Sequence, residues 1–422
     1  MSGMERATAV ADAGQSGRAE SSRDAESRPG AGAETPRRLR VMFFVEGFTD
    51  IRFVTGLSEA VDLTMVVPAR QYAESQLKQR VAQSRARLTV IEIPGGRVAF
   101  QLRSLALLWR RIREFDVVLS QEVLRGSLNA TVVGRLRGVP VVTYMGIAPI
   151  EYFRCRRERG LIGWWKSLIG VAAIRAMLGV NGRLAARTLA MGPYLRDVAA
   201  RYSKRAEVGL YYGVDTEFFR PASESERAEL RRRRDLPLDK FVIFLSSRIS
   251  HEKDPETVLR ATSIARSRGL DAVLINLGGG YAEFLELARR LELPDAGTWV
   301  LGRPPAHPMV DLADYFRAAD VMALASLAEG AAYSTLEALS CGTPVVATAV
   351  GGMAVQLAGY ARLTPRRDAG AMAEQFLWIA SHPEEARAQA MSGRAYIERE
   401  WNRQKAFEDL EVVLRRVAEE NR

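Results

Sequence analysis

Short apolar runs alternate with helical patterns along this chain, and the alternation constrains its fold more strongly than any other feature. A run that is apolar at every position is typical of a strand in a parallel sheet that helices cover on both faces. The strands predicted in the first half are Leu39–Val45, Leu63–Val67, Leu88–Ile93, Val117–Ser120 and Val139–Tyr144, with helices at Thr49–Ala60, Gln71–Gln83, Val98–Arg113 and Leu124–Leu136, and one more strand and helix within Arg187–Tyr202. Repeated strand–helix–strand units predict an α/β protein.

The second half repeats the alternation. Its predicted strands are Phe241–Leu245, Val273–Leu277, Trp299–Gly302, Val321–Ala325, Pro344–Val350 and Ala361–Thr364, and a helical pattern runs from Asp368 to Asn421. At 422 residues the chain is long enough for two domains with well-developed cores. Its two cysteines, Cys155 and Cys341, argue against a disulfide scaffold and fit a reducing compartment.

Composition and turn residues divide the chain into five segments. Residues 1–38 are almost free of large apolar side chains and are predicted to be a disordered tail. This tail lacks the apolar core of a secretory signal, so we expect the folded part to be cytoplasmic. Residues 39–212 are the predicted first domain, 213–221 a linker that Gly213 and Pro221 punctuate, 222–402 the second domain, and 403–422 a final helix.

The net charge of +10 and the isoelectric point near 9.8 indicate an anionic partner. A nucleotide sugar, an anionic membrane surface and a nucleic acid all satisfy this requirement. No recognised nucleic-acid-binding motif is present, and the first strand is not followed by G-x-G-x-x-G, so a nicotinamide dinucleotide site has no support. The histidines are scattered and no Cys/His cluster has the spacing of a zinc site.

The stretch Val321–Gly352 carries the most specific chemistry. A buried strand leads into a loop with Glu329 and Gly330, and a helix predicted from Ser334 places a second carboxylate, Glu337, in its first turn. The free N–H groups at the start of that helix would attract a phosphate. The alternative is purely structural, because Ser334 and Glu337 have the spacing of a capping box and Glu329 could be a solvated loop charge.

The string E-G-x5-LEA-x3-G-x-PVVAT-x2-GG in this stretch resembles the donor-binding motif of retaining GT-B glycosyltransferases of family four. The resemblance implies two Rossmann-like domains with parallel sheets that face a central cleft, and a C-terminal helix that crosses back to the first domain. It implies transfer of a sugar from a nucleotide-diphosphate sugar to an acceptor hydroxyl, with the acceptor on the first domain and the donor mostly on the second. Glu329 would contact the sugar hydroxyls and Glu337 the ribose.

A second motif of the same family, G-R-x4-K-G, corresponds to residues 247–254, with Arg248 and Lys253 kept and Ser247 and Asp254 in place of the glycines. Fixed cations stabilise the negative charge that grows on a leaving nucleoside diphosphate. The alternative for two loop cations is simple solvation. The predicted catalytic residues are therefore Arg248, Lys253 and Glu329.

The predicted donor-binding residues follow the predicted strands or the helix start; they are Gly47, Gly278, Gly302, Arg303, Gly330, Tyr333, Ser334, Thr335 and Glu337. No separate nucleophile is evident, so we expect the leaving phosphate to take the acceptor proton on the face from which it departs. No D-x-D pair is present, so no metal is expected to be required, and the donor itself is the only small molecule expected besides the acceptor.

Three departures from the resembled family affect these expectations. Met145 stands where many relatives have a histidine near the donor sugar, and Tyr212 replaces the usual asparagine of the linker segment. Ala331 and Ala332 replace a bulkier pair after E-G, which changes the shape expected for the sugar pocket.

The stretch Phe153–Val180 combines basic residues with adjacent tryptophans, and its apolar part is about as long as a membrane span requires. Lys166 and Arg175 lie on different sides of a helix, so a true span is not expected. The predicted membrane or acceptor surface consists of Arg154, Arg156, Arg157, Trp164, Trp165 and Lys166. It would lie peripherally on an anionic bilayer, at the inner face of the cell membrane. The alternative is a core helix with a solvated basic start.

The sequence therefore predicts a retaining, metal-independent glycosyltransferase, with a role in envelope or extracellular polysaccharide or in glycolipid synthesis. Its expected partners are a nucleotide sugar and an acceptor glycan or lipid-linked glycan, and no nucleic acid. Two alternatives stay open: a GT-B scaffold that binds nucleotide sugars without turnover, and a nucleotide-sugar epimerase of the same architecture.

Overall fold

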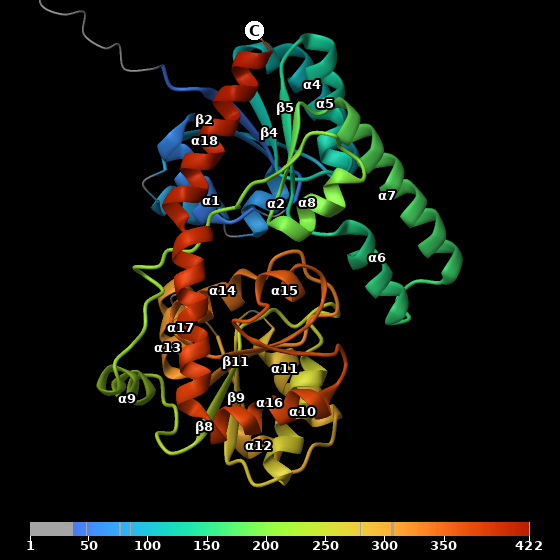
Figure 1. The fold of residues 1–422 in the computed structure, drawn as a ribbon. Helices are drawn as coiled ribbons and strands as arrows, with labels where there is room; N and C mark the ends of the chain where they lie inside the picture. Colours follow the sequence, from blue (N-terminus) through green and yellow to red (C-terminus); the bar gives the residue numbers. More distant parts are fainter. Residues whose placement is uncertain are drawn as a thin grey trace, which may run out of the picture. The chain divides into compact units, whose positions relative to one another are not determined.

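The computed structural model describes residues 37–421, apart from Phe48, Gln76, Arg85, Gly279 and residues 305–307. Residues 38–422 form one compact unit, which contains two separate parallel sheets (Figure 1). The predicted tail lies outside the described residues up to position 36. The domain boundaries at 212/213 and 221/222 stay predictions, but the described residues 209–222 carry only an isolated bridge between Val214 and Asn402.

The first sheet has the strand order β3-β2-β1-β4-β5-β6-β7, and every pair is parallel. The strands are β1 Arg40–Phe44, β2 Asp62–Pro68, β3 Leu88–Ile93, β4 Val117–Ser120, β5 Val141–Met145, β6 Arg187–Ala190 and β7 Ala206–Val208. The helices are α1 Ile51–Ala60, α2 Ala69–Glu74, α3 Leu77–Gln83, α4 Arg97–Arg111, α5 Arg125–Arg137, α6 Pro149–Glu158, α7 Trp164–Leu184 and α8 Pro193–Ala200.

The second sheet has the order β10-β9-β8-β11-β12-β13, again parallel throughout. The strands are β8 Phe241–Leu245, β9 Ala272–Leu277, β10 Val300–Arg303, β11 Val321–Leu324, β12 Val345–Thr348 and β13 Arg362–Thr364. The helices are α9 Glu224–Arg233, α10 Pro255–Ser267, α11 Tyr281–Arg290, α12 Ala296–Trp299, α13 Pro308–Ala318, α14 Tyr333–Ser340, α15 Gly351–Gln356, α16 Ala369–Ser381, α17 Pro383–Glu400 and α18 Arg403–Glu420. The prediction of two parallel sheets is confirmed.

Strand β1 is apolar and buried from Val41 to Phe44 because both faces of the sheet are covered there. In β1, Phe43 packs on one face with Phe53 of α1, while Phe44 packs on the other with Phe100 of α4. All four side chains are buried. Successive side chains of a strand point to opposite faces, so neither face of this strand can be polar.

The C-terminal helix α18 packs on the first sheet's domain, as expected. The Phe407 ring of α18 lies so close to Gly56 of α1 that a Cβ at Gly56 would collide with it. Val214 donates to the carbonyl of Trp401 at 2.7 Å, and Arg403 donates to the carbonyl of Val214 at 3.0 Å. Figure 1 shows α18, in red, beside α1.

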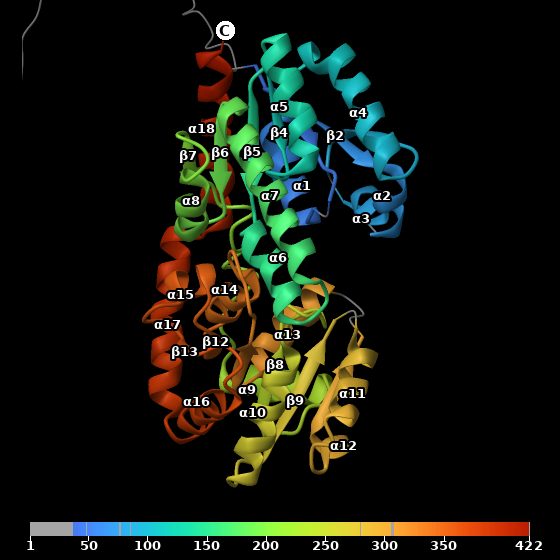
Figure 2. The same ribbon diagram turned by 90° about the vertical axis from the view of Figure 1, so that its right-hand side faces the viewer.

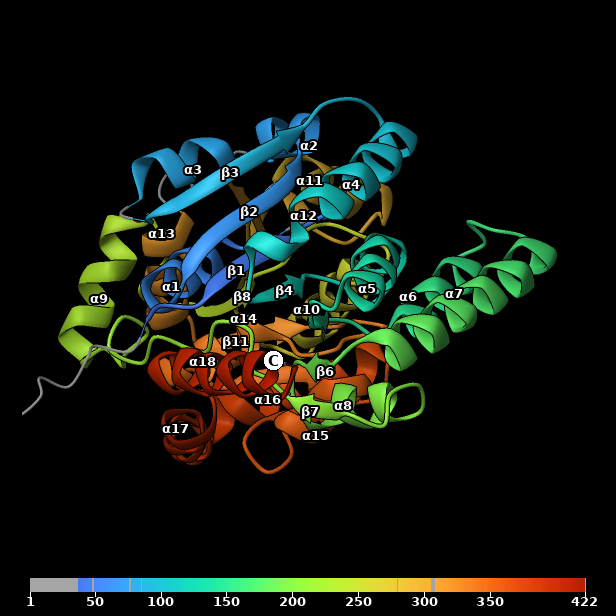
Figure 3. The ribbon, with the colours of Figure 1, turned by 90° about the horizontal axis from the view of Figure 1, so that it is seen from above.

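Two predicted helical stretches are each split in two. The prediction of one helix over Gln71–Gln83 is wrong, because α2 ends at Glu74 and the Ser75 hydroxyl donates to the carbonyl of Tyr72. The Phe153–Val180 stretch breaks after α6 at Gly160, which has a φ of +70°. Glycine adopts this left-handed conformation without strain and commonly ends helices. Figure 3 shows the resulting pair, α6 and α7, running side by side.

Candidate functional site

The two loops that carry the predicted catalytic residues meet at the point where the strand order of the second sheet reverses. The β8–α10 and β11–α14 loops leave the carboxyl ends of neighbouring strands, since β8 pairs with β11. In doubly wound sheets this switch point is where ligands bind. Leu327 donates to the carbonyl of Glu252 at 2.7 Å and ties the two loops together.

Lys253 and Glu329 form an ion pair at this switch point. Their Nζ and Oε2 atoms are 2.6 Å apart, and the side chains are 16% and 8% exposed. A buried carboxylate requires such a partner, because burying a lone charge is costly. The structure therefore brings together two of the three predicted catalytic residues, which are 76 positions apart in the chain.

The third predicted catalytic residue, Arg248, is not held at this pair. Its side chain is 79% exposed, and its Nη2 atom lies 3.8 Å from Glu252 Oε1 on the same loop. Arg248 therefore projects from the rim of the site, whereas Lys253 is fixed inside it.

Glycines let the backbone loops pack closely around Glu329. The Gly352 N–H donates to the Glu329 carbonyl at 2.9 Å, and a Cβ at Gly352 would collide with the Gly330 carbonyl. A Cβ at Gly330 would lie 2.8 Å from the Gly146 carbonyl oxygen. Met145, just before Gly146, is buried in an apolar cluster of the core, so its side chain does not stand open to a ligand.

The capping-box alternative for Ser334 and Glu337 is wrong. Helix α14 begins at Tyr333, its N-cap is Ala332 without a side-chain hydrogen bond, and its first turn holds no acidic residue. Glu337 therefore lies one position beyond the first turn in which it was predicted. Thr335 is buried and donates its hydroxyl proton to the carbonyl of Ala332 at 2.7 Å, while Ser334 is half-buried.

Tyr333 holds the linker segment and does not stand open to a ligand. Its hydroxyl accepts the N–H of Tyr211 at 3.1 Å, and its ring packs against the ring of Tyr212 at a centroid distance of 4.4 Å. This side chain is buried. Its predicted donor contact could come only from its backbone at the start of α14.

Glu337 is bound by an arginine of the first domain. Arg52 Nη1 donates to Glu337 Oε1 at 2.6 Å. The same guanidinium donates to Asp50 Oδ2 at 2.9 Å and to the Tyr212 hydroxyl at 2.6 Å. Its carbon also lies 4.0 Å above the Tyr212 ring. Burial raises the pKa of the Glu337 carboxyl, and Arg52 acts in the opposite direction. A ribose that bound Glu337 would share it with Arg52.

Sequence reasoning missed Arg52 because nothing local links it to Glu337, 285 positions away. The N-cap residue Asp50 is the one local signal, since its carboxylate accepts the Arg52 N–H at 2.9 Å. This hydrogen bond explains why α1 begins there, but it does not indicate that the Arg52 side chain contacts the second domain.

The remaining predicted donor residues lie on loops or strand ends at the carboxyl edges. Gly278 has a φ of +148°, and a Cβ at Gly302 would lie 3.0 Å from the Tyr281 carbonyl oxygen, so both positions favour glycine. Arg303 hydrogen-bonds to Tyr315. A Cβ at the exposed Gly47 would meet no atom within 4 Å, so its surroundings give no steric reason for glycine.

Three buried hydroxyl groups lie on the same two loops, and the sequence did not identify them as binding groups. The Oγ atoms of Ser247, Ser250 and Ser326 have no hydrogen-bond partner within the described part of the chain. Buried polar atoms are nearly always satisfied, so each is a candidate to bind an oxygen of a ligand. Their signal in the sequence is weak, because serine is common in loops.

The first sheet has an equivalent switch point, and two carboxyl groups occupy it. Glu46 follows β1 and Glu122 follows β4, and these strands are neighbours. Arg125 Nε donates to Glu46 Oε1 at 2.9 Å, and the Gly126 N–H donates to Glu122 Oε1 at 3.1 Å. A side chain at Gly126 would collide with Glu122 and press on Glu46, so glycine lets the two groups meet.

This carboxyl pair borders a cavity of about 560 Å³. Its charged lining residues are Glu46, Arg70, Glu74, Arg97, Glu122 and Arg125. Burial and the neighbouring Glu46 carboxyl raise the pKa of Glu122 to about 7. Two carboxyl groups in contact cannot easily both ionise, so the pair holds a proton at moderately acidic pH. Their place two positions beyond the end of each switch-point strand was the signal that could have identified them.

The sequence of the second domain identifies its family. Residues 226–396 match the family model described as glycosyl transferases group 1, and this range contains Lys253, Glu329 and Glu337. This part of the chain belongs to the glycosyl transferases of group 1. The group 1 region thus includes the whole of the second switch point.

Curated proteins similar to this chain include D-inositol 3-phosphate glycosyltransferases. The chain is 32% identical over 250 residues to the one from Catenulispora acidiphila, an alignment that covers 57% of each chain. It is 35% identical over 251 residues to that of Thermobispora bispora, covering 57% of this chain and 56% of the relative. The chain thus spans little more than half the length of these relatives.

Solved structures similar to this chain show its fold. HepE from Anabaena, in complex with UDP-glucose, aligns with a TM-score of 0.70 at 16% identity over 89% of this chain and 99% of HepE. WaaG, a glycosyltransferase involved in lipopolysaccharide biosynthesis, aligns with a TM-score of 0.65 at 13% identity over 89% and 99%. The predicted GT-B fold is confirmed.

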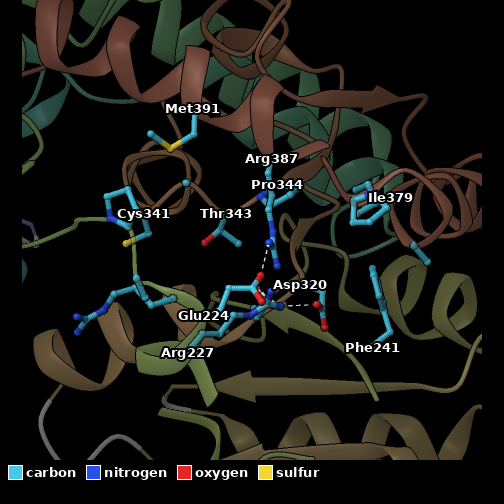
Figure 4. A pocket seen from close by; sticks show the side chains of 17 residues that line it. Glu224, Arg227, Phe241, Asp320, Cys341, Thr343, Pro344, Ile379, Arg387 and Met391 are labelled. Carbon is cyan, nitrogen blue, oxygen red and sulfur yellow. Dashed lines mark hydrogen bonds and ion pairs between the residues drawn. The ribbon is translucent and has the colours of Figure 1, made fainter. Parts of the chain in front are cut away.

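A cavity of about 260 Å³ in the group 1 region lies at the opposite, amino edge of the second sheet (Figure 4). It is bordered by Phe241, at the start of β8, and by Asp320, just before β11. Ion pairs of Arg227 with Asp320 and of Arg387 with Glu224 cross it. Because strands separate it from Lys253 and Glu329, this cavity is not part of the switch point.

The raised pKa of Glu122 makes stability depend on pH. Between the ordinary carboxyl pKa of about 4.5 and the folded value of about 7, the folded chain binds more protons than the unfolded chain. The free energy of unfolding should therefore fall as pH rises through this window, by on the order of 2 kcal/mol. Urea unfolding of the wild type at several pH values should show this slope, and Glu122→Gln should remove it.

The exposed Glu59→Gln serves as the control for that measurement, because its carboxyl lies on the surface of α1. It should leave the slope unchanged. A wild-type stability that is flat between these pH values would contradict the buried carboxyl pair.

Proposed function

We propose that this chain transfers a sugar from a nucleoside diphosphate sugar to an acceptor hydroxyl with retention of configuration. The observation that carries the proposal is the Lys253–Glu329 pair at the switch point of a group 1 sheet. Lys253 and the rim residue Arg248 would neutralise the diphosphate beside the start of α14, and Glu329 would accept hydrogen bonds from the sugar hydroxyls.

In the proposed reaction the bond from the anomeric carbon to the β-phosphate oxygen breaks, and the acceptor oxygen bonds to that carbon on the same face. The acceptor proton passes to the leaving phosphate oxygen, so no protein nucleophile or base is needed. Lys253 stabilises the charge that develops on the phosphate, a contribution that is large in a poorly hydrated site. We expect no required metal.

The acceptor would bind at the first switch point. Carboxyl groups such as Glu46 and Glu122 accept hydrogen bonds from hydroxyls, and Arg97 and Arg125 suit an anionic substituent. The curated relatives are named for an inositol phosphate, which combines both features. HepE was solved with UDP-glucose, which supports a uridine nucleotide as donor. A cytoplasmic location and a role in envelope polysaccharide or glycolipid synthesis belong to the same proposal.

The test is to incubate the chain with UDP-, GDP- and ADP-sugars, with and without polyol phosphates, and to measure nucleoside diphosphate release and product configuration. The proposal predicts release with one donor and a product that keeps the donor's anomeric configuration. Glu329→Gln should abolish it. An inverted product would refute retention, and release without any sugar product would refute transfer.

A binding module without turnover is the second candidate. The exposed side chain of Arg248 favours it, because one of the two cations expected to compensate the leaving diphosphate is not fixed inside the site. Tight binding of a sugar nucleotide without release, across all acceptors, would support the module and contradict the transferase.

A further inference from the structure

Helices α4, α5 and α7 lie side by side over one face of the first sheet, and we call them the three-helix face (Figure 2). Asn129 of α5 donates to the Gln101 carbonyl of α4 at 2.8 Å, and Thr131 of α5 donates to Asn181 of α7 at 2.9 Å. Helices α1 and α18 cover the other face of this sheet.

The charged residues in the helices of the three-helix face are all basic. Helix α4 has four arginines, α5 has three, α7 has two arginines and one lysine, and none of these three described helices contains Asp or Glu. Helix α18, on the other face, mixes both signs, with five acidic residues among its eighteen. The exclusively positive charge is therefore a property of the three-helix face and not of the whole chain.

The same face exposes apolar side chains in rows. On α4, the residues Val98, Leu102, Leu105 and Trp109 follow helical spacing and are 75%, 66%, 41% and 49% exposed. Residues spaced by three and four positions line one side of a helix. This row points away from the sheet, because Phe100 and Leu108 of α4 fill the core beneath it.

The neighbouring helices continue the apolar surface. Their exposed large apolar residues are Val132, Leu136, Trp164, Trp165, Leu168, Ile169 and Val180. Trp165 and Ile169 are each 68% exposed. Large apolar side chains gathered on one surface mark an interaction site.

We propose that the three-helix face docks flat on a membrane surface rich in anionic phospholipid. Exposed apolar rows would enter the boundary between head groups and acyl chains, and arginines beside them would pair with lipid phosphates. Tryptophan favours this boundary because its ring is amphipathic. The predicted surface on α6 and α7 thus extends to α4 and α5, which the sequence did not indicate.

Helix α7 is long and apolar enough to cross a membrane by length and composition alone. Its inner side, however, is part of the protein core. Ile174 and Leu178 are buried, and the Asn181 side chain donates to the carbonyls of Val123 and Leu124, both at 2.9 Å. Crossing the bilayer would break these contacts, so docking along the helix is the arrangement that preserves the fold.

A basic hollow at the C-terminal ends of α5 and α7 adds to this charge. It has a volume of about 740 Å³, and its described lining includes no Asp or Glu. Its charged lining residues are Arg135, Arg183, Arg201, Lys204 and Arg205. Its position at the end of the three-helix face suits the phosphate of a lipid head group.

The test is cosedimentation of the full chain with phosphatidylcholine vesicles, with and without an equal part of phosphatidylglycerol. We expect binding to the anionic vesicles that falls with salt. Arg110→Glu with Arg175→Glu should lower the partition coefficient more than tenfold, at about fivefold for each removed charge. Leu168→Ser with Ile169→Ser should lower it similarly.

Matched controls separate this face from net charge and from general hydrophobicity. Arg80→Glu with Arg290→Glu makes the same charge change on α3 and α11, and Val412→Ser removes a residue that is 63% exposed on α18. These variants should bind like the wild type. All variants should release nucleoside diphosphate normally without vesicles, so this inference and the proposed transfer can fail separately.

Two results would overturn the inference. The first is a wild type that does not bind anionic vesicles, or control variants that lose binding as much as the face variants. The second is binding of duplex DNA or RNA that the face variants abolish while vesicle binding is unaffected, since this would assign the face to a nucleic acid.

Discussion

Replacing Lys253 with alanine is expected to lower kcat/KM for nucleoside diphosphate release by about 10²–10³-fold. Lys253 Nζ is the cation held beside Glu329. Without it, the negative charge of the leaving diphosphate would lose the positive charge that stabilises it. The measurement is the initial rate of release from the donor that the panel identifies. Lys253→Arg should recover only part of the rate, because a planar guanidinium does not reproduce the point charge of an ammonium group.

Arg248→Ala provides the comparison from the same loop. Its side chain is 79% exposed, so we expect a smaller loss than for Lys253→Ala. Lys240→Ala, whose ammonium pairs with Asp271 near the amino edge of the sheet, should not change the rate. A Lys253→Ala variant that stays folded, as thermal melting would show, and keeps wild-type turnover would contradict the proposed role.

Replacing Arg52 with alanine is expected to destabilise the chain by about 3–5 kcal/mol. The substitution removes the cation that Glu337, Asp50 and Tyr212 share, and it leaves the buried Glu337 carboxylate without its partner. Urea unfolding at neutral pH measures this loss. The unfolding transition should stay cooperative, because α1 and α18 keep their apolar contacts.

A double-mutant cycle isolates the Arg52–Glu337 contact. Combined with Glu337→Gln, Arg52→Ala should cost clearly less than the sum of the single losses, because no buried charge is then left alone. Arg70→Ala, which breaks an exposed pair on α2, should change nothing measurable. Strict additivity in the cycle would show that the two side chains do not interact.

Much of the fold could be predicted from local pattern. Strands such as Phe241–Leu245 and Leu88–Ile93 have the predicted bounds. Phe241–Leu245 is apolar throughout because both faces of its sheet are covered, whereas Leu88–Ile93, at the edge of the first sheet, also contains Thr89 and Glu92. The short strand β7 was missed: Ala206, Glu207 and Val208 form the edge of the sheet, where one neighbour suffices and no apolar run is needed.

The candidate site was predictable only where a motif encodes it. The second-domain loops were found because Lys253 and Glu329 stand in motifs with fixed spacing. The contacts of Arg52 and the pairing of Glu46 with Glu122 depend on which strands are neighbours, and this information lies in the assembled sheets. Two features of Asp254 could not be predicted from the sequence either. They are its left-handed φ of +45° and its ion pair with Arg159, which lies in the α6–α7 connection.

The most direct measurement is a crystal structure of the chain with its sugar nucleotide bound. We expect the β-phosphate within hydrogen-bonding distance of Lys253 Nζ, beside the first residues of α14, with the sugar hydroxyls against Glu329. A nucleotide bound elsewhere, for example in the basic hollow at the ends of α5 and α7, with the Lys253–Glu329 pair untouched, would contradict it.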